Sequence, residues 1–244
     1  MGMKADYGID APSVIRNLAL AAIASIAVGL GLNAWLTSNT HWLAVVFLVW
    51  GSLAGLSMLI TSALMLWGSK VGKLRERERI LDSLELRGDE IVLDVGCGRG
   101  LLLNGAARRL PRGKAIGVDL WRSEDESDNR IGATLSNAEA EGVKERVDVR
   151  TGDMRELPLP DSSVDIVVSS LAIHNIGDEG GRALAVREVA RVLKPGGRVA
   201  LLDFQCTDEY ARTLADLGWR DVQRSPNRFA MFPPVRGVTG TKPV

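Results

Sequence analysis

The stretch LDVGCGRG, Leu93–Gly100, decides the fold of this 244-residue chain. It follows the apolar run EIVLDV at 90–95 and precedes a helical pattern at 100–110, so it forms a glycine-rich turn between a buried strand and a helix. Glycines let a ligand approach the backbone, and the start of the helix offers free N–H groups. The spacing GxGxG has Leu101 where a dinucleotide fingerprint has its third glycine. The turn alone therefore predicts a ligand site without identifying the ligand.

Two carboxylates farther along the chain narrow the choice of ligand. Asp119 ends a second predicted strand, and Asp153 follows a third. The carboxyl ends of parallel strands meet at one edge of an open α/β sheet, where ligands bind. A carboxylate at the position of Asp119 can accept hydrogen bonds from both hydroxyls of a ribose. A carboxylate at the position of Asp153 can accept a hydrogen bond from an adenine amino group, with Met154 against the ring.

Strands and helices alternate from residue 90 onward, which indicates an α/β fold. We expect a Rossmann-like, seven-stranded, mostly parallel sheet with helices on both faces. The predicted strands are 90–95, 114–119, 146–151, 164–170, 198–204, 219–224 and 235–242, and the predicted helices are 100–110, 129–141, 180–193 and 207–217. The last two strands have only a loop between them, so they can pair antiparallel.

With these motifs in place, residues 80–241 resemble the class I S-adenosylmethionine-dependent methyltransferases. The resemblance rests on LDVGCGRG, GVDL, GDMRELPLPDSSVDIVVSS and LKPGGRVALLDF, which occur in this order. SSLAIHNI at 169–176 is similar to the ubiquinone and menaquinone C-methyltransferases, except that His174 stands where those enzymes have arginine. The small-molecule methyltransferases of the type 11 group resemble the chain most.

The resemblance implies S-adenosylmethionine as cofactor and S-adenosylhomocysteine as product. The residues that it assigns to the cofactor site are Asp94, Gly96, Cys97, Gly98, Gly100, Asp119, Leu120, Trp121, Asp153, Met154, Ser169 and Ser170. An Asn/Asp-Pro-Pro-Tyr stretch is missing from the sequence, so methylation of nucleobase amines is not expected.

His174 is the candidate catalytic residue. Methyl transfer from a sulfonium is an in-line displacement in which the enzyme chiefly positions the nucleophile. A base is needed where the acceptor has a proton to lose, and histidine titrates near neutral pH. His174 follows the fourth strand at the ligand-binding edge, so we expect it to act as a base or to touch the substrate. The alternative is a histidine that shapes a loop. Asn175 is expected to orient His174 or the substrate.

Composition excludes other classes of site. Two cysteines are too few for a disulfide framework or a Cys-rich zinc site, and two histidines argue against a histidine metal site, so no metal is expected. The formal net charge is zero, so nucleic acid is not expected as a partner. The soluble part fits a reducing, cytosolic setting.

Two uncharged runs, Leu18–Leu36 and Trp42–Trp67, precede this domain. Each is long enough to cross a bilayer, so we expect transmembrane helices at about 14–36 and 42–67, joined by TSNTH. A helical pair in a soluble bundle would show a polar face, and a cleaved signal peptide has a shorter apolar region. Cationic residues flank the pair, at Lys4, Arg16, Lys70, Lys73, Arg75, Arg77 and Arg79. The positive-inside rule then places both termini and the catalytic domain in the cytoplasm.

The predicted organisation is a membrane anchor at 1–68, an amphipathic connecting helix at 69–88 and a methyltransferase domain at 89–244. The connecting helix has Val71, Leu74, Leu81 and Leu84 at helical spacing, and it either docks on the domain, touches anionic lipid, or does both. Gly51 and Gly55 form a GxxxG motif, which packs against the Gly29/Gly31 region or forms a homodimer. The apolar segment 229–234 contacts lipid or substrate, or caps the core.

Three functions remain at this stage. The first is methylation of a lipophilic small molecule, such as a prenyl quinone, phospholipid or sterol-like compound, at the cytoplasmic membrane face. The second is methylation of a small thiol, arsenical or phenol, with the hairpin as a simple anchor. The third is a non-catalytic cofactor-binding membrane module, which the intact cofactor positions disfavour.

Overall fold

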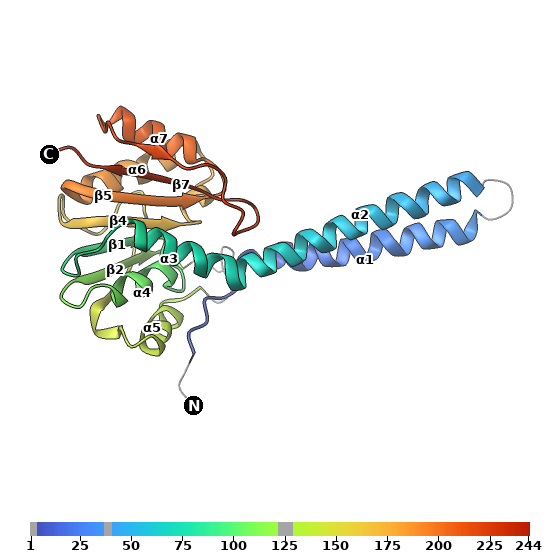
Figure 1. The fold of residues 1–244 in the computed structure, drawn as a ribbon, viewed down its shortest axis with the longest axis horizontal. Coiled ribbons are helices and arrows are strands. Elements are labelled where there is room, and N and C mark those ends of the chain that lie inside the picture. The colour runs from blue at the N-terminus through green and yellow to red at the C-terminus, as the bar shows by residue number, and fades with distance from the viewer. Residues whose placement is uncertain (1–3, 37–40, 122–128) are drawn as a thin grey trace.

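The computed structural model describes residues 4–36, 41–121 and 129–244, and it consists of an α/β body with two long helices projecting from it (Figure 1). The long helices are α1 (Pro12–Trp35) and α2 (His41–Trp67). Most of the predicted TSNTH loop lies outside the described residues, and so does the acidic run after Trp121.

The body contains one seven-stranded sheet in the order β3-β2-β1-β4-β5-β7-β6. Its strands are β1 (Ile91–Val95), β2 (Lys114–Asp119), β3 (Val147–Thr151), β4 (Val164–Ser170), β5 (Leu193–Asp203), β6 (Gln223–Arg224) and β7 (Arg236–Thr241). Strands β1 to β5 are parallel, while β7 runs antiparallel to β5 and to β6. The expectation of a mostly parallel sheet with an antiparallel end is confirmed.

Two strand boundaries differ from the predictions for identifiable reasons. β5 begins at Leu193, not at residue 198, because Leu193 pairs with Val164 ahead of an irregularity in the ladder. β6 is only two residues long. Trp219, which was expected to start this strand, instead donates its backbone N–H to Leu214 and closes the end of a helix, with its ring in the core.

Helices cover both faces of the sheet. On one face lie α3 (Lys73–Ser83), α4 (Leu101–Arg108) and α5 (Ile131–Ala140); on the other lie α6 (Glu179–Val192) and α7 (Thr207–Asp216). Successive strand residues alternate between two apolar clusters, as Val92 packs with Leu81 while Leu93 packs with Val186. Short 3₁₀ turns span Lys144–Arg146 and Ile173–Asn175.

Helix α2 continues into α3 without an intervening loop, whereas a separate connecting helix was expected at 69–88. A single π-turn, Gly68–Gly72, joins the two, and the helix ends at Ser83. The π-turn brings the helix against a loop that precedes β7: a Cβ on Gly72 would lie 1.9 Å from the Ala230 carbonyl oxygen. Only glycine fits at this close approach.

The burial of α3 also differs from the predicted apolar face. Leu74 is exposed, whereas Lys73, Glu76 and Arg77 are buried. These charged side chains are satisfied by long-range partners: Lys73 Nζ lies 2.9 Å from Asp10, and Arg228 lies 3.2 Å from Glu76. Part of the cationic segment therefore faces protein.

Helices α1 and α2 pack closely through small residues. A Cβ on Gly51 would lie 2.8 Å from the Ser25 carbonyl oxygen, and one on Gly55 would lie 2.9 Å from the carbonyl oxygen of Ala22. The GxxxG motif is thus used within the chain, and it gives no separate support for a homodimer. Both helices are long and apolar enough to cross a membrane, by length and composition.

Candidate functional site

The glycine-rich turn lies at the carboxyl end of β1 and is held in a conformation that favours glycine. Gly96, Gly98 and Gly100 all have positive φ, at 71°, 47° and 84°. A Cβ on Gly96 would lie only 2.2 Å from the Ala172 Cβ. The Gly96 amide donates to the Val118 carbonyl at 2.8 Å, which ties the turn to β2. The turn therefore packs its backbone directly against the segment that follows β4.

Asp119, at the end of β2, is fixed by the same turn. Its Oδ2 accepts from the Gly98 amide at 2.8 Å, and its Oδ1 accepts from the Trp121 amide at 2.6 Å. Asn129 Nδ2 lies 3.3 Å from Oδ1. A carboxylate has about four acceptor positions, so these three donors leave one position, on Oδ2, for a ribose hydroxyl.

Asp94 and Cys97 are more deeply buried than Asp119. Asp94 is buried, and its carboxylate accepts from the Leu103 amide at 2.9 Å, so it orders the start of α4. Cys97 is buried and packs with the apolar cluster that includes Leu103.

Asp153 lies beyond β3 and is held by a neighbouring arginine. Arg155 binds its carboxylate through Nη2 at 2.6 Å, and the Arg155 amide donates to it at 2.8 Å. This hydrogen-bonded pairing raises the pKa of the Arg155 guanidinium. Adenine binding at Asp153 would therefore compete with Arg155 for this carboxylate.

His174 lies in the 3₁₀ turn after β4, next to a buried carboxylate at the end of β5. Its Nδ1 is 2.8 Å from Asp203 Oδ1, in a close contact whose angle departs from that of a straight hydrogen bond. Asp203 also accepts from the Phe204 amide at 2.9 Å and from the Tyr210 hydroxyl at 3.1 Å. The Phe204 ring packs edge-on against the imidazole. The arrangement can orient His174 as an acceptor of protons.

A cavity of about 550 Å³ joins these groups. Of the predicted site residues it is lined by Asp94, Gly96, Cys97, Gly98, Asp119, Leu120, Asp153, Met154, Ser170, His174 and Asn175. Gly100, Trp121 and Ser169 are not among its lining residues. The Ser169 hydroxyl donates to the Val95 carbonyl, and the Trp121 indole N–H donates to Thr151. Their cofactor contacts stay predictions.

The other end of the same cavity is lined by the helix base, which is where α1 begins at Pro12 and α2 ends at Trp67. Val14 of α1 and Met65 of α2 contribute apolar side chains, and Phe232 and Pro233 contribute from the loop before β7. Asp10 and Lys73 also line it.

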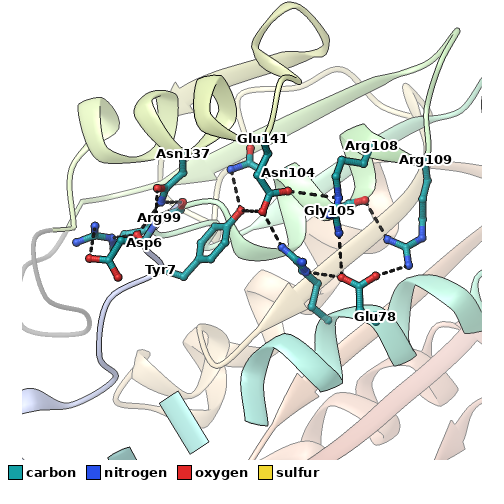
Figure 2. Close-up of polar contacts among 11 residues, drawn as sticks. Asp6, Tyr7, Glu78, Arg99, Asn104, Gly105, Arg108, Arg109, Asn137 and Glu141 are labelled. Atoms are coloured by element: carbon teal, nitrogen blue, oxygen red, sulfur yellow. Dashed lines mark hydrogen bonds and ion pairs between the residues drawn. The ribbon is translucent and has the colours of Figure 1, made fainter. Parts of the chain in front are cut away.

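The chain's first described residues, 4–11, form an N-terminal strap across the body (Figure 2). Tyr7 is buried between helices: its hydroxyl donates to Glu141 at 2.5 Å, and its ring lies against the Arg77 guanidinium. Asp6 exchanges two hydrogen bonds with Asn137, and its carbonyl accepts from Arg99 of the cofactor turn. Burial raises the pKa of the Tyr7 phenol. The strap thus reaches the edge of the glycine-rich turn.

Replacing Tyr7 with alanine is expected to release the strap. Burial of an aromatic side chain stabilises a segment by about 1.5–3 kcal/mol, so amide exchange at Asp6 should accelerate by at least about tenfold. Hydrogen exchange with mass spectrometry measures this. Tyr7→Phe, which keeps the ring and loses the bond to Glu141, serves as the matched control and should have a smaller effect. Equal exchange in all three proteins would contradict the role of the ring.

Sequence reasoning missed Asp203, although a signal existed. Like Asp94 and Asp119, it is a carboxylate at the end of a predicted strand. The strap had no such signal, because its contacts join residues that are far apart in the chain.

Comparison with known proteins agrees with this geometry. A family described as "Methyltransferase domain" (type 11) matches residues 93–201. The demethylmenaquinone methyltransferase of Lactobacillus johnsonii is 28% identical over 64% of this chain and 57% of its own length. The 27-O-demethylrifamycin SV methyltransferase of Amycolatopsis mediterranei is 33% identical over 58% of this chain and 48% of its own. The chain thus spans about half the length of the curated relatives it matches.

The fold is also shared with solved structures. An S-adenosylmethionine-dependent methyltransferase from Aquifex aeolicus superposes with a TM-score of 0.55 at 23% identity, over 69% of this chain and 90% of that one.

The residues present fit S-adenosylmethionine. Asp119 offers a carboxylate acceptor for a ribose hydroxyl beside the Gly98 amide, and Gly96 and Gly98 line the same cavity. Leu120 and Met154 offer apolar surface suited to an adenine ring. A cavity of about 550 Å³ is within the usual range for such ligands. Residues 93–201 therefore match the methyltransferase domain family, and the site is suited to S-adenosylmethionine as the cofactor.

Proposed function

We propose that this protein is a membrane-anchored methyltransferase that transfers a methyl group to a lipophilic small molecule at the cytoplasmic face of a membrane. The observation that carries the proposal is the single cavity that extends from the cofactor turn to the base of the two apolar helices. One end offers Asp119 and Gly96, and the other offers Val14, Met65 and Phe232. An acceptor with an apolar tail suits the second end.

The exposure of the two helices supports the membrane part of the proposal. Apolar side chains such as Leu20, Ile23 and Trp50 face outward along their length. Contiguous apolar surface of this extent is rarely left in water. The cationic residues at the helix base and the uncharged far end support an orientation with the catalytic domain in the cytoplasm. We also propose the division into a membrane anchor at 1–68 and a methyltransferase domain at 89–244, with α3 as the connection.

In the proposed chemistry, His174 is the base that takes the proton lost by the methyl acceptor. S-adenosylmethionine, when bound, supplies an electrophilic methyl group on a sulfonium. The imidazole lines the cavity and takes the proton that an acceptor hydroxyl, phenol or acidic carbon gives up, while Asp203 orients the ring from behind. Asn175 lines the same cavity, where it can hold the acceptor's polar end.

Labelled methyl transfer tests the proposal. The full chain, in detergent, is incubated with labelled S-adenosylmethionine and with lipid or aqueous extracts of the host in parallel. We expect the label to enter the lipid phase. Label in the aqueous phase alone would contradict the proposal and favour the second candidate, a small thiol, arsenical or phenol as acceptor.

A hairpin-free variant sharpens the test. Joining residues 1–11 to residues 68–244 through a Gly/Ser linker removes α1 and α2 but keeps the strap. Its cofactor affinity should match that of the full chain, whereas its transfer to membrane-dissolved acceptor should fall. Full activity of this variant on vesicle-dissolved acceptor would contradict a role for the helices in acceptor capture.

A further inference from the structure

The loop at 229–233, which connects the bridge at Arg228 to β7, is positioned at the end of the second apolar helix. Its backbone touches the π-turn directly, because a Cβ on Gly68 would lie 3.1 Å from the Phe232 nitrogen and one on Gly72 would meet the Ala230 carbonyl. Figure 1 shows this segment, just before β7, extending toward the helix base. The loop is thus held at the level where α2 ends at Trp67.

The side chains of the loop divide into two groups. Met231 is buried and packs with the cluster that includes Val235, so it caps the core. Phe229, by contrast, is 75% exposed, and Phe232 is 36% exposed while also lining the cavity. Core packing therefore explains Met231 but leaves Phe229 unexplained.

Cations lie at the same level of the helix. Lys70, in the π-turn, is exposed, and the Arg75 guanidinium lies 5.5 Å from the centre of the Trp67 ring. Tryptophan and arginine of this kind mark the membrane–water interface. Each cation near an anionic surface adds about 1 kcal/mol of attraction. An exposed phenylalanine beside such cations is complementary to an anionic bilayer, with its ring below the headgroups.

We infer that the 229–233 loop is a second membrane contact, which inserts Phe229 into the interface of an anionic phospholipid bilayer. Phe232, on the same loop, then forms one wall of an entrance that opens from the bilayer into the cavity, opposite Val14 and Met65. The inference rests on the proposed function, because it needs the two long helices to lie in the membrane.

Depth-dependent quenching tests the inference on the full chain, reconstituted in vesicles of phosphatidylcholine and phosphatidylglycerol. On a Cys206→Ser background, an environment-sensitive fluorophore is attached at Phe229→Cys. The same label at Leu56→Cys, exposed in α2, reports the span, and at Leu217→Cys, exposed at the end of α7, it reports the aqueous side. The remaining cysteine, Cys97, is buried.

We expect the label at 229 to shift its emission to the blue and to be quenched by lipids brominated near the headgroup, while aqueous iodide quenches it weakly. The label at 56 should respond to lipids brominated near the chain end, and the label at 217 to iodide alone. A label at 229 that behaves like the one at 217, while 56 responds to lipid, would overturn the inference and leave the anchor standing. Iodide quenching at both 229 and 56 would overturn both.

Activity gives an independent readout. Phe229→Asp should lower transfer to membrane-dissolved acceptor several-fold while leaving the affinity for S-adenosylmethionine unchanged, and the conservative Phe229→Leu should retain most of the transfer. Wild-type transfer by Phe229→Asp would count against an insertion that matters for acceptor entry.

Discussion

His174→Ala is expected to lower turnover by about 10²- to 10⁴-fold, the usual contribution of a positioned general base. The affinity for S-adenosylmethionine should be unchanged, because the groups that fit the cofactor are Asp119 and the glycine-rich turn. Single-turnover transfer of labelled methyl into the lipid extract measures the first quantity, and titration calorimetry measures the second.

Asp203→Asn and Asn175→Ala separate orientation from proton transfer. Asp203 holds the imidazole from behind and does not line the cavity, so its replacement by the isosteric amide should lower kcat without changing the KM for the acceptor. Asn175 lines the cavity, so its replacement should change KM first. Wild-type turnover in His174→Ala would show that the histidine only shapes the loop, and the base would have to be sought elsewhere in the cavity.

Asp119→Ala is expected to weaken binding of S-adenosylmethionine by roughly 10-fold or more, since a hydrogen bond to a charged acceptor contributes about 1.5–3 kcal/mol. The same carboxylate also accepts from the Gly98 and Trp121 amides, so its loss loosens the glycine-rich turn. Calorimetry with S-adenosylmethionine and with S-adenosylhomocysteine should show parallel losses, because both ligands contain the ribose.

The matched control is Asp216→Ala, which removes an exposed carboxylate at the end of α7. It should leave both affinities at the wild-type value. If Asp119→Ala bound the cofactor as tightly as this control does, the assignment of Asp119 to the ribose would be wrong.

Local patterns in the sequence were sufficient to predict the sheet and the cofactor edge. Glycines at positive φ, apolar strand runs and strand-end carboxylates each depend on neighbours in the chain, so these patterns placed Gly96, Asp119 and Asp153 at one edge of the sheet, where they line one cavity. Asp203 obeys the same rule and was recoverable by applying it to one more strand.

Contacts between distant segments were not predictable in this way. Lys73 looked like part of a cationic face for lipid, but it is buried because Asp10 lies opposite it in the folded chain. Leu74 looked apolar and inward, but it is exposed, and it follows soon after the π-turn Gly68–Gly72, where the helix departs from regular α geometry. The burial of Tyr7 depends on Glu141 and Arg77, neither of which a single sequence connects to it.

The strap and α3 together have a kinetic consequence. The chain leaves the body through the strap, at one side of the helix pair, and returns through α3, so both ends of the pair are clamped to the body. A body joined to its helices by one flexible linker would rotate freely. This body is joined to them by two segments, so it keeps the same face toward the helix pair. For a protein embedded as proposed, the search for acceptor becomes two-dimensional. At a fixed bulk concentration of acceptor, adding inert lipid should slow turnover, because the rate follows the mole fraction of acceptor in the bilayer.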